Sequence, residues 1–249
     1  MIVDNNKMCC SVAAAATDAT HEAALEQPKK RLMLPTKTPQ RQRFMANRCL
    51  GRGAQATVYS AHVDADLAEG EVRESFAIKV FNSSAIMAST PEDLALEAHT
   101  HELLIGHPNI MQLHGSYIAR DSAPIVRVPR SIPRNEQDRF AKWREGHEQL
   151  EGHPVMVFEE CRYGDLFNFV SAHGALRDYK LLKYLFLQIC SGLHALHTQA
   201  SLCHRDIKLE NILVSDDGVL KLCDFGMVQP VDIESSKRQG TEMYMAPEV

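Results

Sequence analysis

The strongest constraint on the fold is the order in which strand-like and helix-like segments follow one another. Short apolar segments rich in β-branched residues dominate the chain before Gly164, and the longest helical pattern, residues 175–200, follows it. The two patterns differ in period, about 2 residues for a strand and about 3.6 for a helix. Strands first and helices later predict an α+β fold of two lobes, a small β-rich lobe and a helical lobe.

Individual segments are consistent with this order. Residues 48–63 alternate around a glycine cluster, which predicts a hairpin, and residues 75–82 form a short apolar strand with a lysine inside it. Residues 90–106 carry a threonine cap, a proline at the first helical position and a closing glycine, so they predict a helix. Further strands are expected at 110–119 and 154–161, a short helix at 165–174, and a final hairpin at 211–225 whose turn contains Asp-Asp-Gly.

Two segments fall outside this pattern. Residues 1–43 read as a disordered tail, whose part 29–43 has six basic residues and no acidic one; a localisation signal or docking arm is the alternative. Residues 120–153 read as an inserted surface loop with one short helix around Asp138–Gln149, and a recognition element is the alternative. We therefore place a domain at 44–249, with a small lobe at 44–160 and a partial large lobe at 161–249.

Composition excludes several classes of protein. The net charge of -5 over 249 residues gives no basic field for nucleic acid. No apolar run approaches the roughly 18 residues of a membrane span, and the N-terminus has no convincing signal peptide. The cysteines show no metal-binding spacing, so we expect free thiols in a reducing compartment, the cytoplasm or alternatively the nucleus. They are Cys9, Cys10, Cys49, Cys161, Cys190, Cys203 and Cys223.

The glycine-rich stretch "LGRGAQATV", residues 50–58, is the first candidate site. Gly51 and Gly53 have no Cβ, so backbone amides there can approach a phosphate closely. Ala56 stands where a third glycine would complete the G-x-G-x-x-G pattern. Taken alone, the stretch is equally well explained as an ordinary hairpin turn.

Lys79, in "FAIKV", is the second candidate. Burial of an unpaired ammonium group is costly, so a lysine inside an apolar strand needs an anion, unless it lies on an edge strand and reaches water. Glu97 on the following helix is the predicted partner, and Glu92 and Glu102 compete for that role.

The densest cluster of chemical groups is "CHRDIKLEN", residues 203–211. Asp206, Lys208 and Asn211 offer a carboxylate, an ammonium and a carboxamide within six residues, a set suited to hydroxyl activation, phosphate neutralisation and metal ligation. Asp224 follows 18 residues after Asp206, beyond the predicted hairpin, which returns a second carboxylate toward the first. Oxygen ligands from Asn211 and Asp224 suit magnesium bound to phosphates.

These motifs, with "DFG" at 224–226 and "APE" at 246–248, resemble the eukaryotic protein kinases in identity and order over residues 44–249. The resemblance implies a two-lobed kinase fold and transfer of the γ-phosphoryl group of ATP, with Mg2+, to serine or threonine hydroxyls of protein substrates. The D-x-K-x-x-N spacing is the serine/threonine form, and the hinge and catalytic stretch lean toward calcium/calmodulin-kinase-like members.

The resemblance also implies roles for matching residues. Lys79 would contact the α- and β-phosphates with Glu97 as its partner, Asp206 would accept the hydroxyl proton, and Lys208 would steady the γ-phosphate. Asn211 and Asp224 would bind Mg2+. The glycine-rich loop over ATP would consist of Leu50, Gly51, Arg52, Gly53, Ala54, Gln55, Ala56, Thr57 and Val58.

The adenine would bind at "VFEECRYGDLF", which resembles the kinase hinge. Phe158 would be the gatekeeper, and backbone groups of Glu159 and Cys161 would hydrogen-bond the ring. Asp165 would lie near the ribose. The ring would be sandwiched by Val58, Ala77 and Leu213.

The resemblance implies that "GTEMYMAPEV", residues 240–249, is the last part of an activation segment that includes Ser235, Ser236 and Thr241. Thr241 would hydrogen-bond near Asp206. Arg205 would hold a phosphate placed on Ser235 or Ser236 by an upstream kinase or regulator, although both serines also fit ordinary loop residues.

Two departures from the kinase pattern stand out. His101, four residues after Glu97, occupies a position that is usually apolar, so either it packs neutral there or the predicted helix register is wrong. The helices that follow A-P-E in the family, with an arginine for Glu248, are missing. A truncated kinase with an exposed apolar face on 175–200 and marginal stability is therefore expected. A non-catalytic nucleotide-binding module and a pure interaction scaffold are the alternatives.

Overall fold

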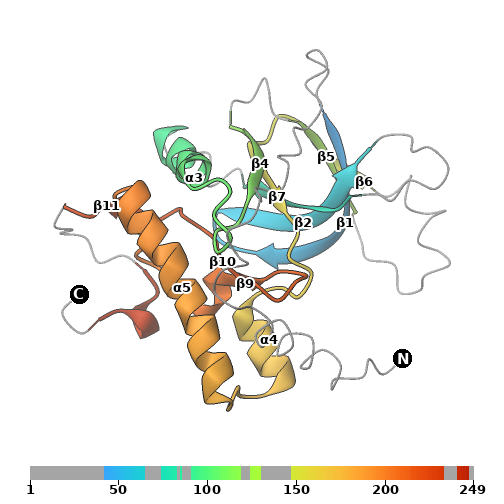
Figure 1. The fold of residues 1–249 in the computed structure, drawn as a ribbon. Helices are drawn as coiled ribbons and strands as arrows, with labels where there is room; N and C mark the ends of the chain where they lie inside the picture. The colour runs from blue at the N-terminus through green and yellow to red at the C-terminus, as the bar shows by residue number, and fades with distance from the viewer. Residues whose placement is uncertain are drawn as a thin grey trace. The chain divides into compact units, whose positions relative to one another are not determined.

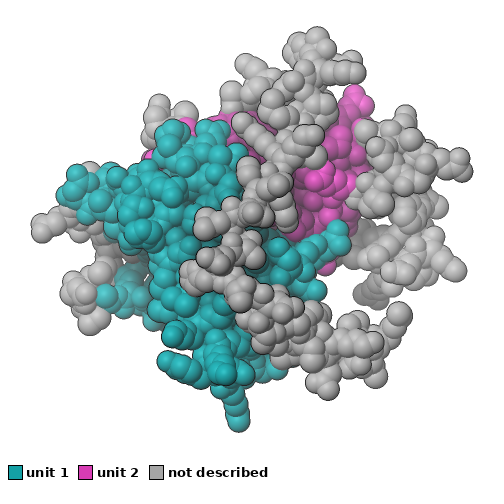
Figure 2. All heavy atoms as spheres, in the orientation of Figure 1, with its two compact units in different colours: residues 1–31, 99–112, 161–249 teal, residues 32–98, 113–160 magenta. Residues whose placement is uncertain are grey.

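A computed structural model describes residues 42–64, 74–82, 85, 91–118, 124–129, 147–232 and 240–246. Unit 1 contains the described residues of 99–112 and 161–249, and unit 2 contains those of 32–98 and 113–160 (Figure 2). Each unit has its own cluster of buried apolar side chains. The predicted α+β fold with one β-rich and one helix-containing part is confirmed.

Unit 2 is built on a seven-stranded sheet with the order β4-β7-β3-β2-β1-β5-β6 (Figure 1). Neighbouring strands run antiparallel, except that β1 and β5 run parallel. Buried valine, isoleucine and phenylalanine side chains from the strands form its core. The strands are β1 Arg43–Arg52, β2 Ala56–Val63, β3 Phe76–Phe81, β4 Leu113–Tyr117, β5 Ile125–Pro129, β6 His147–Leu150 and β7 Val155–Glu159.

The glycine-rich stretch forms the turn between β1 and β2, as predicted for a hairpin. The Gly53 amide donates to the Ala56 carbonyl at 2.9 Å, which closes the turn. From the end of β3, the Asn82 amide donates to the Gln55 carbonyl at 2.8 Å, and its side chain donates to the Ala54 carbonyl at 3.4 Å. The turn is therefore held from a second strand.

The segment 120–153 differs from its prediction. It was expected to be a surface loop, yet its described parts include β5 and β6, and His147–Leu150 is a strand where the end of a helix was expected. Val126 is fully buried and Val128 is 6% exposed, and both belong to the core of unit 2. Alternating buried valines are a strand pattern, so β5 forms by covering the edge of β1.

The start of β1 is fixed by residues just before it. The Ile125 amide donates to the Gln42 carbonyl at 3.0 Å, and the Tyr117 hydroxyl donates to the Gln42 side-chain oxygen at 2.9 Å. The Asp64 amide donates to the Arg43 carbonyl at 2.8 Å. The rest of the predicted N-terminal tail lies outside the described residues.

Helix α3, Pro91–Leu103, begins at the proline predicted for its first position and ends three residues before Gly106. Polar as well as apolar side chains are buried on it, because Glu97 is 4% and His101 is 1% exposed. These two residues are four apart and so lie on the same helical face.

Among the described residues of unit 1, two helices follow β7 in the chain. Helix α4, Leu166–His173, is capped by the Asp165 side chain, which accepts from the Asn168 amide at 2.8 Å. Helix α5, Tyr179–Gln199, is capped by Asp178, which accepts from the amides of Lys180 and Leu181. Both are the aspartate caps that satisfy otherwise unpaired amides of a first turn.

Short strands and turns complete unit 1. The predicted final hairpin is present as β9, Ile212–Val214, and β10, Leu220–Leu222, and its turn passes through Gly218 with φ 77°. A second pair joins β8, Leu202–Cys203, to β11, Gln229–Pro230. The 3₁₀ turns are η2, Leu209–Asn211, and η3, Glu242–Tyr244.

Helix α5 packs closely on β10 at Gly192. A Cβ atom there would lie 2.8 Å from both the Asn109 carbonyl oxygen and a Leu222 methyl carbon. The Asn109 side chain donates to the Leu220 carbonyl at 3.0 Å and to the Gln188 side chain at 3.1 Å. Only glycine permits this approach.

At other positions, helix α5 exposes large apolar side chains to solvent. Tyr179 is 77% exposed, Phe186 is 63% exposed and Leu187 is 54% exposed, which confirms the exposed apolar face predicted for this helix. In the described part of the chain, α5 and the other helices are too short or too polar to cross a membrane.

Candidate active site

The lysine predicted to need an anion has one in unit 2. The Lys79 ammonium group donates to both carboxylate oxygens of Glu97, at 2.6 and 2.8 Å. The two side chains are 14% and 4% exposed, so the pair is shielded from water and more strongly coupled than a surface ion pair. The other described candidate, Glu102, is largely exposed and lies 4.0 Å from His99.

One face of the sheet carries Lys79 together with Val58, Ala77 and Phe158. Val58 is the register partner of Lys79, and Ala77 is the register partner of Phe158. Directly opposite residues, and residues two apart on one strand, project to the same face. That face therefore presents an ammonium group beside small and apolar side chains, as a phosphate and an aromatic ring would require.

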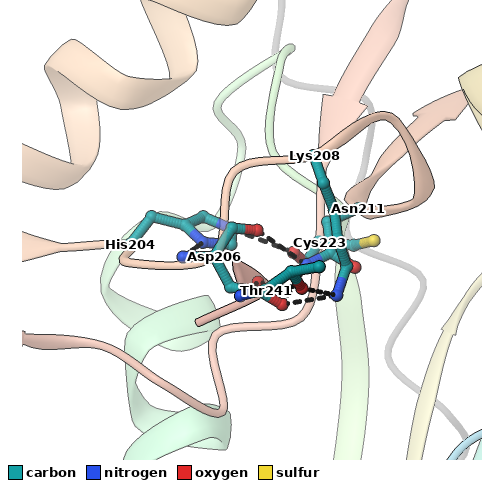
Figure 3. Close-up of polar contacts among 6 residues, drawn as sticks. All are labelled: His204, Asp206, Lys208, Asn211, Cys223 and Thr241. Carbon is teal, nitrogen blue, oxygen red and sulfur yellow. Dashed lines mark hydrogen bonds and ion pairs between the residues drawn. The ribbon is translucent and has the colours of Figure 1, made fainter. Parts of the chain in front are cut away.

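Unit 1 contains a second cluster, centred on the buried Asp206 (Figure 3). Its Oδ2 accepts from the Lys208 ammonium group at 2.7 Å and from the Asn211 side chain at 3.1 Å. Its Oδ1 accepts from the Thr241 amide at 2.9 Å and from the Thr241 hydroxyl at 2.7 Å. The structure thus brings together Asp206, Lys208, Asn211 and Thr241, all of which the sequence selected.

These contacts determine the charge of Asp206. Burial alone would raise the pKa of the Asp206 carboxyl, but hydrogen bonds from Lys208 and Thr241, the Lys208 charge and the Asn211 hydrogen bond hold this pKa below its usual 3.8. The carboxylate is therefore ionised at neutral pH and able to accept a proton from a hydroxyl group. A carboxylate has about four acceptor positions, and four donors occupy them here.

The second carboxylate predicted for the site follows the β9–β10 hairpin. The Cys223 amide donates to the Asn211 carbonyl at 3.1 Å, which brings the residue before Asp224 back to the 203–211 segment. Asp224 has a left-handed backbone, φ 62°, and is exposed. Single left-handed residues other than glycine are uncommon and concentrate at functional sites.

The donor set at this point suits a hard cation only in part. The described residues contain no group of three or more His, Cys, Asp or Glu side chains able to hold a metal. One carboxylate and one carboxamide leave most of an octahedral shell to other ligands, which is the usual way in which proteins bind magnesium together with phosphates. Asn211 and Asp224 therefore fit a metal that arrives with a nucleotide.

His204 was quoted in the motif but not selected from the sequence. It is 2% exposed, its Nε2 donates to the Cys223 carbonyl at 3.1 Å, and its Nδ1 accepts from the Asp206 amide at 3.4 Å (Figure 3). Burial holds the pKa of His204 below 6.5, although the Cys223 carbonyl and the charges of Asp224 and Asp206 act to raise it. A neutral His204 thus links the two aspartate-bearing segments; its position two residues before Asp206 was the available signal.

The structure decides between the two explanations given for His101. The Lys79–Glu97 pair shows that the helix register was correct, and His101 is buried with its ring 4.5 Å from the Phe225 ring. Its Nδ1 lies 3.0 Å from the Met111 carbonyl and donates to it, since a carbonyl only accepts. His204 contacts the same Phe225 ring edge-on at 5.4 Å. A hydrogen-bonded histidine thus fills the place where an apolar residue was expected.

Thr241 is held in place by the glycine before it. Gly240 has φ 115°, and a Cβ there would lie 2.6 Å from the Arg205 carbonyl oxygen. Asp165 and Leu213 form a bridge of their own in unit 1. Ser235, Ser236 and Glu248 lie outside the described residues, as do Cys9 and Cys10; none of the five described cysteines forms a disulfide bond.

A β-sheet unit with a lysine–glutamate pair and a second unit with an Asp-Lys-Asn cluster are the arrangement expected of the protein kinase class. Comparison with known proteins agrees: a family model described as "Protein kinase domain" matches residues 44–249. The chain therefore belongs to the protein kinase family.

Its relatives include serine/threonine kinases. The chain is 31% identical over 216 residues to CBL-interacting serine/threonine-protein kinase 15 of Arabidopsis thaliana, covering 83% of this chain and 41% of that protein. It is 30% identical over 209 residues to serine/threonine-protein kinase cds1 of Schizosaccharomyces pombe, covering 81% of this chain and 37% of that protein. For cell division control protein 7 of the same yeast the identity is 30% over 204 residues, covering 81% of this chain and 15% of that protein. The chain thus spans less than half of each.

Proposed function

We propose that this chain transfers the γ-phosphoryl group of ATP to serine or threonine hydroxyls of protein substrates. The observation that carries the proposal is the Asp206 cluster, in which an ionised carboxylate is bonded to Lys208, Asn211 and Thr241. Phosphoryl transfer needs positioning and charge neutralisation more than covalent catalysis, and this cluster supplies both.

The kinase resemblance assigns ATP-binding roles to residues within each unit. In unit 2, Lys79, oriented by Glu97, would hold the α- and β-phosphates, under the glycine-rich turn 50–58. Also in unit 2, Val58 and Ala77 would contact the adenine, with Phe158 as gatekeeper and a backbone bond from Glu159. In unit 1, the resemblance assigns Leu213 and the Cys161 backbone to the adenine and Asp165 to the ribose. Mg2+, bound by Asn211 and Asp224 with the phosphates, would neutralise charge that develops on the transferring group.

The proton of the substrate hydroxyl would pass to Asp206. Since four donors already occupy its oxygens, a substrate hydroxyl must replace one of them. Lys208 is the donor best able to leave, because its flexible side chain can follow a phosphate, whereas the Thr241 amide is fixed in the backbone. Lys208 would then neutralise the γ-phosphate as Asp206 receives the hydroxyl.

Finer features of the function rest on sequence alone. From the hinge and the 203–211 stretch we infer that the chain is most similar to the calcium/calmodulin-kinase-like subgroup. We also infer regulation through Ser235 or Ser236 by an upstream kinase. The cysteine pattern and the basic tail favour a cytoplasmic or nuclear location. The protein substrate is proposed only as a class, proteins that present serine or threonine.

Asp224→Ala in a single-turnover assay with radiolabelled ATP and a generic Ser/Thr substrate tests the function. Loss of a metal ligand should abolish detectable transfer, while Asp232→Ala, an exposed aspartate eight residues later, should transfer like the unchanged chain. An Asp224→Ala rate equal to that of the unchanged chain would sink the assignment. ATP binding without transfer by the unchanged chain would favour a non-catalytic regulatory module, and no effect of MgATP on melting would favour a scaffold.

A further inference from the structure

Glu160 has a buried carboxylate that the proposed function does not use. It follows β7 directly, and its side chain is 5% exposed. Its Oε2 accepts from the Ser60 hydroxyl at 2.9 Å, and its Oε1 lies 3.4 Å from an Arg48 guanidinium nitrogen. Ser60 is itself 4% exposed, whereas the Arg48 side chain is 59% exposed. The hydrogen bond from Ser60 is therefore the shielded and stronger part of this contact, and the exposed ion pair with Arg48 contributes less.

The three residues lie on the nucleotide-facing side of unit 2. In the register of the sheet, Arg48 lies opposite Ser60, Ser60 lies opposite Ala77, and Ala77 lies opposite Phe158. Directly opposite residues of antiparallel strands share one face. That face also carries Lys79, two residues after Ala77 on β3. The Glu160 carboxylate thus joins the same face as the residues assigned to ATP.

The position of Glu160 in the chain gives the contact its significance. The peptide group shared with Glu159 and the peptide group shared with Cys161 meet at the Cα of Glu160. Backbone groups of Glu159 and Cys161 are the ones assigned to adenine. A side chain anchored on β2 restricts the backbone dihedrals of its own residue and thereby the direction of both peptide groups.

We propose that Glu160 is a positioning residue for nucleotide binding, which sets the direction of the two adjoining peptide groups by anchoring its carboxylate on Ser60. The proposal rests on the assignment of ATP to this face. Burying a carboxylate carries a desolvation penalty, and the exposed Arg48 side chain adds little to offset it, so stability alone does not explain a carboxylate here. Pre-organisation of a binding segment does, since it reduces the ordering cost of binding.

The test compares Glu160→Ala, Glu160→Gln and Ser60→Ala, with Glu151→Gln, an exposed glutamate of the same unit, as the matched control. Titration with MgATP should show a Kd increased about tenfold for Glu160→Ala and for Ser60→Ala, the factor expected for one buried hydrogen bond to a charged group. The double variant should be no weaker than Glu160→Ala, because the two changes remove one interaction. Glu160→Gln, whose amide oxygen still accepts from Ser60, should stay within about threefold of the unchanged chain.

A second measurement does not depend on ATP. Amide hydrogen exchange of residues 159–161 in the nucleotide-free chain should be about tenfold faster in Glu160→Ala and Ser60→Ala than in the control. If the unchanged chain does not bind MgATP, the proposed function fails and exchange alone decides the present inference. A lower melting midpoint with unchanged Kd and unchanged exchange would show a purely structural role and overturn it. KM for ATP should rise in Glu160→Ala with kcat within about twofold, the signature of lost binding common to ground and transition states.

Discussion

Thr241 donates two hydrogen bonds to one oxygen of Asp206, from its amide at 2.9 Å and from its hydroxyl at 2.7 Å, and its hydroxyl accepts from Lys208 at 2.8 Å. One residue of the activation segment therefore fixes both the proposed proton acceptor and the proposed phosphate-binding lysine. Because the backbone bond survives any side-chain change, the contribution of the hydroxyl can be measured separately.

Thr241→Val keeps the shape of the side chain and removes only its hydroxyl. A hydrogen bond to a charged group contributes roughly 1.5–3 kcal/mol, so kcat should fall about tenfold to a hundredfold, with KM for ATP little changed. Thr241→Ser should recover most of the rate. Equal steady-state rates for all three forms on a peptide substrate would contradict a role for the hydroxyl.

Glu97→Ala leaves the Lys79 ammonium group without its shielded carboxylate. Breaking one side of a buried pair costs about 3 kcal/mol, and this loss should appear in the free energy of unfolding measured by urea denaturation. Glu102→Ala, an exposed change on the same helix, should lie within about 0.5 kcal/mol of the unchanged chain. Indistinguishable unfolding curves for the two variants would count against the pair.

Gly192→Ala adds a methyl group where the Asn109 carbonyl oxygen and Leu222 leave no space. Overpacking of a rigid contact costs about 1–3 kcal/mol, so the melting temperature should fall by several degrees, followed by calorimetry. His194→Ala, at an exposed position of the same helix, is the control and should melt near the unchanged chain. An unaltered melting temperature for Gly192→Ala would mean that α5 can move away from β10.

Acid should destabilise the fold in two stages. Burial lowers the pKa of His204 in the folded chain, so His204 binds a proton more readily when the chain is unfolded. The free energy of unfolding is therefore greatest above pH 6.5 and declines as the pH falls below that value. His107 and His114, whose pKa values burial also lowers, add to the same stage. The lowered pKa of Asp206 adds stability that is present above its usual 3.8 and is lost only below that value, as pH falls through the folded-state pKa.

Urea denaturation between pH 7.5 and pH 5 measures the first stage. Each such histidine contributes a slope of at most about 1.4 kcal/mol per pH unit. His204→Phe should reduce the slope, and His99→Gln, at a largely exposed position, should leave it unchanged. A free energy of unfolding that stays constant over this range would show that these histidines are not held neutral.

Local motifs made the Asp206 cluster predictable from one sequence. Asp206, Lys208 and Asn211 lie within six residues, so their residue types and spacing alone indicate their chemistry. The Lys79–Glu97 pair followed from a charge inside an apolar strand and an acid on the next helix. His101 marks the limit of this reasoning, because only the Met111 carbonyl and the Phe225 ring explain how a histidine is accommodated there.

Contacts between distant segments were not predictable where no motif marked the residues. The alternation at Val126 and Val128 is too short to outweigh the charged residues and prolines around it, and nothing in one sequence indicates a parallel partner in β1. Likewise, Ser60 and Glu160 are 100 residues apart, and neither stands out until the sheet register brings them together.

The hydrogen bonds of Gln42 and Arg43 bear on where a shortened protein should begin. The family match starts at residue 44, yet the amides of Ile125 and Asp64 and the Tyr117 hydroxyl all donate to the two residues before it. A protein trimmed to start at Phe44 would leave these three donors unmatched and remove the Arg43–Ile125 pair from the contact between β1 and β5. For expression and crystallisation, the N-terminal boundary of the folded domain is therefore best drawn upstream of Gln42.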